Sequence, residues 1–164
     1  MATMEFLLAE SGIRQLYGRY ADAVWRQDSE AFAECFTPDA VWKIAGRQVQ
    51  GRADIAALFE ASVAPSERVM FWSAVQAIQL CEGGATGRAQ VTELIKRKDG
   101  QGLRTLGMYY ERFAEQDGAW RLSWHHFDLH YLGAPDLSDA IYDAPDYGPA
   151  PAMPGPGDPT TERR

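Results

Sequence analysis

The sequence predicts one α+β domain, with helices first and an antiparallel sheet after them. Apolar residues recur at helical spacing as far as residue 63, and four β-rich segments separated by glycine turns follow residue 69. A chain of 164 residues with 46% hydrophobic residues is long enough to bury one core. We therefore expect a domain over residues 1–133 and a C-terminal extension over residues 134–164.

The first helix is predicted over residues 13–24, with Ser11 as its N-cap. Its apolar residues form one stripe: Ile13, Leu16, Tyr17, Tyr20 and Val24. Asp28 is expected to cap a shorter second helix that ends at residues 37–39. A third helix is expected over residues 53–63, after two short strands at residues 40–44 and just before Gly51. All three helices would cover one face of the sheet.

The second half predicts a four-stranded antiparallel meander. Its strands are expected at residues 70–80, 85–96, 103–114 and 119–132, with turns at the glycines between them. Residues 136–142 predict a short helix, and residues 144–164 hold six of the nine prolines and almost no aliphatic side chains. The extension is therefore expected to be flexible from about residue 144, or to lie on a neighbouring subunit.

Charge and composition exclude several classes of partner. The 23 acidic and 16 basic side chains give a net charge of −7, which argues against nucleic acid and anionic membranes. No apolar run approaches the ~20 residues of a membrane span, so a cytoplasmic location is expected. Cys35 and Cys81 lie far apart without metal-binding spacing, which favours two reduced thiols.

Several residues, in this order, resemble the SnoaL-like branch of the nuclear-transport-factor-2-like (NTF2-like) superfamily. They are the Tyr17/Tyr20 stripe, Asp28 before the second helix, the segment 36–41, Gly51 before the third helix, and the late segment 117–122. The resemblance covers about residues 10–132 and implies a cone of three helices and a curved sheet. The superfamily holds cofactor-free enzymes as well as non-catalytic carriers, so this fold does not fix a function.

By layout, the chain resembles hexachlorocyclohexane dehydrochlorinase, scytalone dehydratase and bile-acid dehydratase. In the first and third of these, an Asp near the end of the first helix works with a His on the first meander strand. The resemblance places Trp25 at the Asp position and Phe71 near the His position, while Tyr20 matches a tyrosine of bile-acid dehydratase. The usual Asp/His dyad is absent, unless a slip of three residues brings Asp22 or Asp28 into the site.

Adjacent histidines near the C-terminal end of the meander are the candidate acid/base groups. Side chains alternate along a strand, so His125 and His126 point to opposite faces. His126 shares its parity with Trp120, Leu122 and Trp124, and this more apolar set predicts that His126 faces the cavity. A metal site of His126, Asp128 and His130 is a weaker alternative. The cofactor-free relatives imply neither metal nor cofactor.

Aromatic side chains exceed what a core of this size needs, which predicts a pocket for a hydrophobic ring compound. The expected substrate-binding residues are Trp25, Trp42, Phe71, Tyr110 and Trp124. A charged residue of the meander is a candidate to replace the missing dyad, and parity does not select it among Glu93, Arg97, Arg104, Glu111 and Arg112.

The resulting hypothesis is a cofactor-independent lyase or isomerase that uses Tyr20 with His126, or with His125. Dehydration is the leading reaction, and cleavage of a carbon–carbon bond is the alternative, because it needs the same acid/base pair. The alternative is a non-catalytic protein that binds a small hydrophobic molecule. The resemblance also implies a homo-oligomer, a trimer or else a dimer.

Overall fold

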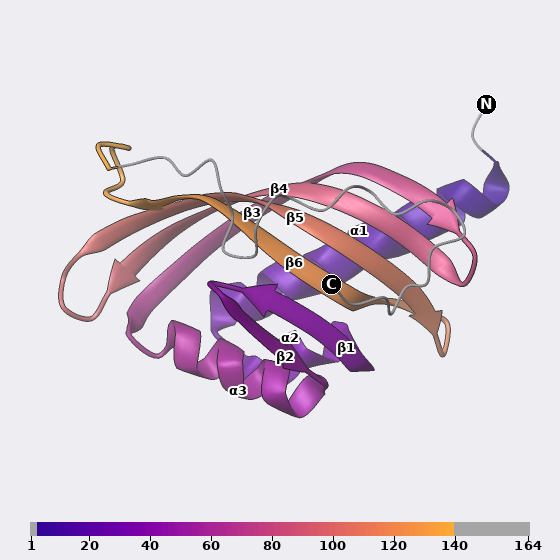
Figure 1. Cartoon of the computed structure of the whole chain (residues 1–164), viewed down its shortest axis with the longest axis horizontal. Coiled ribbons are helices and arrows are strands. Elements are labelled where there is room, and N and C mark those ends of the chain that lie inside the picture. The colour runs from indigo at the N-terminus through magenta and orange to yellow at the C-terminus, as the bar shows by residue number, and fades with distance from the viewer. Residues whose placement is uncertain (1–2, 140–164) are drawn as a thin grey trace.

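The computed structural model describes residues 3–139 and shows three helices against a six-stranded sheet. In Figure 1 the long strands curve across the first helix, while the other two helices lie beside the two short strands. The predicted α+β cone is therefore confirmed. The flexible segment expected from residue 144 lies outside the described residues. Residues 136–139, the described part of the short helix expected over residues 136–142, form a turn rather than a helix, and the rest of that segment lies outside the described residues. None of the helices within residues 3–139 is long and apolar enough to span a membrane.

Helix α1 runs over Met4–Arg26 and so begins well before the predicted start. Thr3, rather than Ser11, caps it by accepting a hydrogen bond from the Phe6 amide at 3.2 Å. Asp28 caps α2 (Ser29–Glu34) as predicted, through a 2.9 Å bond from the Ala31 amide. Helix α3 spans Arg52–Val63, one residue longer than expected.

The predicted meander is confirmed over β3 (Ser66–Cys81), β4 (Gly84–Arg97), β5 (Gly102–Gln116) and β6 (Ala119–Gly133). Each of these strands pairs antiparallel with the next. The strand order across the sheet is β2-β1-β6-β5-β4-β3.

Strand β1 (Phe36–Ile44) makes the sheet mixed rather than wholly antiparallel, because it pairs in parallel with β6. Its other neighbour is the short antiparallel strand β2 (Arg47–Gln50). Residues 37–39, where the second helix was expected to end, thus belong to β1, and α2 ends earlier, at Glu34. Local sequence signals cannot reveal a parallel pair whose partners lie some eighty residues apart along the chain.

The helices pack on one face of the sheet, called here the inner face, and the opposite face is called the outer face. Fully buried side chains between the helices and the inner face include Ile13, Phe32, Phe36, Ile55 and Phe113. Burying such large apolar side chains contributes about 1.5–3 kcal/mol each and fixes the helices against the sheet.

A β-bulge in β6 changes which residues face inward. Phe113 of β5 pairs with Leu122, but the preceding Arg112 pairs with Trp124, so Ser123 is one extra residue in the register of β6 against β5. One extra residue reverses the alternation of the side chains that follow it, here as far as Leu129, after which a second register shift occurs. Leu122 is therefore part of the core, whereas Trp124 lies on the outer face below the Arg112 guanidinium.

Candidate functional site

A cavity of about 360 Å³ lies between the helices and the inner face. Aromatic side chains dominate its wall: Tyr20, Phe32, Trp42, Phe59, Tyr109 and Phe127. Glu93 is the carboxylate on that wall. A larger depression of about 630 Å³ is lined by Trp72, Met108, His130 and their neighbours, and it includes neither the two buried tyrosines that line the inner cavity nor Glu93, which lines it too. The inner cavity is therefore the candidate site.

A chain of polar contacts runs from the cavity wall into the protein. The Tyr20 hydroxyl lies 3.3 Å from Nε2 of His125, and Nδ1 of the same ring lies 2.9 Å from Oε1 of Glu111. The contact between Nδ1 of His125 and Oε1 of Glu111 has the distance of an ion pair but not the alignment of a hydrogen bond. The Tyr17 hydroxyl donates to the other carboxylate oxygen of Glu111. Both His125 and Glu111 are fully buried, so the histidine can reach the cavity only through Tyr20.

Two tyrosines present hydroxyl groups to the cavity. The hydroxyls of Tyr20 and Tyr109 lie 3.4 Å apart. Burial, followed by neighbouring groups, raises the pKa of each phenol well above its ordinary value. Both phenols therefore keep their protons at neutral pH and act there as hydrogen-bond donors.

Glu93 of β4 is the titratable carboxyl group at the cavity. Burial raises its pKa to about 6, although a hydrogen bond from the Thr105 side chain acts in the opposite direction. A carboxyl group with such a pKa changes protonation near neutrality, as an acid/base catalyst requires. Glu93, Tyr20 and Tyr109 line the same cavity, and the charge of Glu93 contributes to the raised pKa values of both tyrosines.

Four of the residues expected at the site meet on the inner side of the sheet. Tyr20 and Trp42 line the cavity, and the ring of Phe71 lies 5.4 Å from the ring of Tyr20. His125 lies behind them. Their roles in binding and catalysis stay predictions, but their positions bring them into one cluster.

The prediction that His126, Tyr110 and Trp124 face the cavity is wrong. The bulge at Ser123 places Trp124 and His126 on the outer face, where their rings stack at 5.7 Å. Tyr110 pairs with His126 across β5 and β6 and shares that face. The parity argument assumed uninterrupted alternation, and the extra residue reversed it.

Trp25 lies near Phe71, as the resemblance implied, but outside the cavity. Its indole Nε1 donates to the Phe71 carbonyl at 2.8 Å, and its ring meets Trp72 edge-on at 5.6 Å. The side chain is 44% exposed. Neither flanking carboxylate replaces it, since Asp28 caps α2 and Asp22 pairs with Arg26 on the surface.

Tyr17, Glu93 and Glu111 are site residues that sequence reasoning did not single out. Both glutamates were among the charged meander residues, and pairing across the sheet explains why they point inward. Glu93 lies opposite the buried Phe71 and Thr105, and Glu111 lies opposite His125. Strand parity counted back from Phe113 of the core would have found Glu111.

No three His, Cys, Asp or Glu side chains within residues 3–139 gather closely enough to hold a metal ion. The alternative ligand set included Asp128 and His130, whose side chains lie 3.5 Å apart. The arrangement that the described residues do offer is a proton-donating hydroxyl and a titratable carboxyl group on an aromatic cavity.

The fold and this cavity define a cone-shaped α+β domain that encloses an aromatic-lined cavity. Comparison with known families is more specific, since the SnoaL-like domain profile matches residues 5–125. The chain belongs to this family, and thus to the NTF2-like superfamily. No protein with a curated function matches its sequence.

Solved structures share the fold. A Novosphingobium aromaticivorans protein proposed to be an aromatic ring hydroxylase is 26% identical over 83% of this chain and 98% of its own, with a TM-score of 0.72. A proposed scytalone dehydratase from the same species is 16% identical over 82% and 93%, with a TM-score of 0.73. A type 3 hexachlorocyclohexane dehydrochlorinase from Novosphingobium barchaimii is 17% identical over 85% and 97%, with a TM-score of 0.71. The last two show likeness of fold alone.

Proposed function

We propose that this protein is a cofactor-independent lyase or isomerase that acts on a hydrophobic ring compound in the inner cavity. The observation that carries the proposal is the Tyr20 hydroxyl, which lies on the cavity wall and 3.3 Å from Nε2 of the buried His125. A donor with a second acid/base group directly behind it can release a proton and recover it.

Dehydration is the leading reaction, and the groups at the cavity account for every proton. The Glu93 carboxylate removes a proton from a substrate carbon, and the carbon–oxygen bond breaks as the electron pair forms the new double bond. Tyr20 gives its proton to the leaving oxygen, which departs as water, and protonated His125 returns a proton to the phenolate. Glu93 then loses its proton to solvent, and His125 takes up one proton from solvent by way of the Tyr20 hydroxyl, so that every group returns to its starting state. In an isomerisation, Glu93 would return that proton to a different carbon.

Glu111 and Tyr17 act through His125 in this scheme. The Glu111 carboxylate, 2.9 Å from Nδ1, stabilises the ring when it is protonated, and the Tyr17 hydroxyl donates to the other carboxylate oxygen. Both are positioning residues rather than catalytic ones, because neither lines the cavity.

The cavity supports a flat and apolar substrate. Six aromatic side chains line it, and the cavity volume of about 360 Å³ is within the usual range for small-molecule sites. Two solved structures of this fold carry the names of elimination enzymes, a dehydratase and a dehydrochlorinase, which agrees with the leading reaction.

The second candidate function is binding without chemistry. Trp25 and Phe71 stand where relatives by layout carry the Asp/His dyad, and a hydrogen bond between the Trp25 indole and the Phe71 carbonyl occupies that place. A carrier would need the aromatic wall but neither Glu93 nor His125.

A ligand screen followed by mass spectrometry distinguishes the enzyme from the non-catalytic carrier. Aromatic, steroid and lignin-like ring compounds are screened by thermal shift, and each stabilising compound is analysed after incubation. A product lighter by one water supports the dehydratase. An unchanged mass with a new isomer on chromatography supports the isomerase, and the recovery of only the original compound supports the carrier.

Tyr20→Phe then tests the mechanism, with Tyr110→Phe as the matched control on the outer face. Loss of the donor should lower turnover by about 10²-fold or more and leave the melting temperature nearly unchanged. The control should retain full turnover. Equal turnover in both variants would contradict the proposed role of Tyr20.

A further inference from the structure

A second cavity, of about 350 Å³, lies between α1, α2, the first residue of α3 and the start of β6. It shares no lining residue with the inner cavity. Four arginines line it (Arg19, Arg26, Arg52 and Arg121) and the carboxylates on its wall are Asp22 and Glu34. Its wall is therefore positively charged, although the whole chain carries a net charge of −7.

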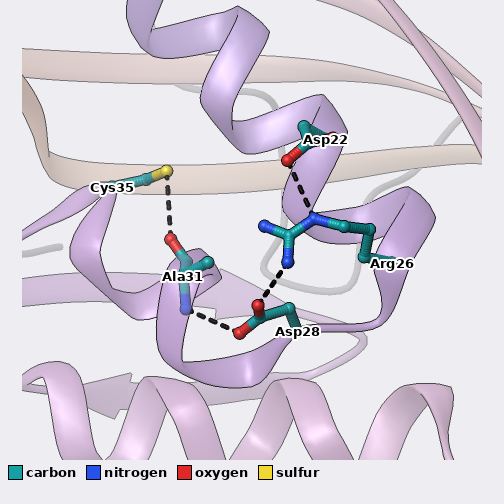
Figure 2. A network of polar contacts seen from close by, with 5 residues as sticks. All are labelled: Asp22, Arg26, Asp28, Ala31 and Cys35. Atoms are coloured by element: carbon teal, nitrogen blue, oxygen red, sulfur yellow. Dashed lines mark hydrogen bonds and ion pairs between the residues drawn. The ribbon is translucent and has the colours of Figure 1, made fainter.

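One of the four arginines is already neutralised. Figure 2 shows Arg26 between two carboxylates, with Nε 2.9 Å from Asp22 and Nη1 2.6 Å from Asp28. Asp28 is held in turn by the Ala31 amide, and this hydrogen bond is the main reason that its pKa is lowered. The positive charge of Arg26 is therefore balanced by Asp22 and Asp28, and it contributes little to the binding of a ligand.

The other three arginines are held by backbone carbonyls instead of carboxylates. Arg52 Nε donates to the Phe36 carbonyl at 2.8 Å, Arg121 Nη1 to Gln116 at 2.6 Å and Arg19 Nη2 to Trp120 at 3.3 Å. Within residues 3–139, no carboxylate forms an ion pair with any of the three. A guanidinium has five N–H donors, so each keeps donors after its tether is made.

The three guanidinium groups also act on a common point. Burial raises the pKa of the Cys35 thiol on the cavity wall to about 11; the charge of Arg19 opposes that rise, Glu34 adds to it, and Arg121 and Arg52 oppose it. The three arginines come from three separate elements, α1, β6 and α3, and therefore approach the cavity from different directions.

We infer that this cavity is a binding site for a tetrahedral oxyanion, a phosphoryl group. One bidentate arginine engages both oxygens of a carboxylate, whereas three guanidinium groups from three separate elements match an anion with at least three acceptor oxygens. The volume of about 350 Å³ exceeds that of a bare phosphate, so the phosphoryl group of a small phosphomonoester fits as well as the free ion. The site is independent of the proposed lyase or isomerase activity.

Calorimetric titration of the whole protein with inorganic phosphate at low ionic strength tests the site. Arg19→Gln and Arg121→Gln should each weaken phosphate binding by about tenfold or more, as expected for the loss of a charge-assisted hydrogen bond. Arg14→Gln is the matched control, because Arg14 lies on the same helix as Arg19, outside the cavity, in an exposed pair with Glu10.

Titrations with phenyl phosphate and acetate identify the ligand chemistry. Tighter binding of phenyl phosphate than of inorganic phosphate would assign the site to a phosphomonoester, and the reverse would assign it to the free ion. Failure of the unaltered protein to bind either phosphate compound would overturn the inference. Acetate binding as strong as phosphate binding would overturn it too, as would equal weakening by Arg14→Gln. Arg19 is exposed, so the Arg19→Gln result stands even if Arg121→Gln does not fold.

Discussion

Two neighbouring histidines of β6 have different environments, because His125 lies on the inner face and His126 on the outer face. His125 lies inside a buried chain that runs from Glu111 to the Tyr20 hydroxyl on the cavity wall. His126, one residue later, stacks on Trp124, whose ring also lies below the cations of Lys43 and Arg112. Both imidazoles are buried. The difference shows that burial alone does not mark an acid/base residue, and that access to a cavity through a titratable partner is what distinguishes His125.

Exchanging each histidine for glutamine gives the largest expected difference between the faces. His125→Gln should lower turnover by about 10²–10⁴-fold, because the group that returns a proton to Tyr20 is lost. His126→Gln should leave turnover within a few-fold of the original protein. Steady-state kinetics on the substrate from the ligand screen provide the measurement, and circular dichroism checks the fold. Similar losses in both variants would remove the functional distinction between the two faces.

Glu111→Leu should show a smaller effect, on stability. It leaves the Tyr17 hydroxyl and Nδ1 of His125 buried without their partner, and an unsatisfied buried polar group costs about 1–3 kcal/mol. The free energy of unfolding should therefore fall by about 3 kcal/mol in urea titration. Glu115→Leu, at an exposed position on the same strand, should change it by less than about 0.5 kcal/mol. Equal effects would show that Glu111 stabilises nothing beyond its own strand position.

Glu93 should give the smallest effect, one that depends on pH. Its pKa rises from 4.5 to about 6 on folding, so the folded state holds the proton more tightly than the unfolded chain. The resulting stabilisation is present below pH 4.5 and is lost as the pH rises through about 6. From about pH 4 to about pH 7.5, the unfolding free energy of the original protein should fall by about 2 kcal/mol relative to Glu93→Gln.

Activity should follow the opposite course, because the deprotonated Glu93 is the proposed base. Turnover should increase through about pH 6 in the original protein, and Glu93→Gln should lack this increase. A turnover profile that is flat across this range in the original protein would assign the proton transfer to another group.

The sequence predicts the fold well because its signals are local and repeated. The apolar stripe from Ile13 to Val24 marks α1, and the glycine turns between β-rich segments mark the meander. The helix start at Met4 escapes this reasoning, since its first turns expose Met4, Leu7 and Leu8 and have no buried stripe to detect. The parallel pairing of β1 with β6 is likewise invisible, because no local pattern specifies which strands meet across the sheet.

The site is predicted only in part, for a physical reason that Ser123 illustrates. Tyr20 and Trp42 reach the cavity because helix and strand periodicity holds around them. At Ser123 the strict alternation of side chains along β6 is interrupted, and the strand holds neither glycine nor proline near this point to signal a bulge. Glu93 and Glu111 were undecided because parity does not choose among the five charged candidates of the meander, and only cross-strand pairing with Phe71 and His125 shows which of them point inward.

The bulge at Ser123 also has an evolutionary consequence. A single-codon insertion or deletion in this stretch of β6 exchanges the residues that look into the cavity for those that look away from it, without changing any of their identities. Aligned columns over residues 124–129, before the second register shift of β6, therefore correspond in space only among homologues that carry the same extra residue. An alignment without a gap at this place would compare His126 with the cavity-facing position of a homologue that lacks the bulge, and would assign the chemistry to the wrong histidine.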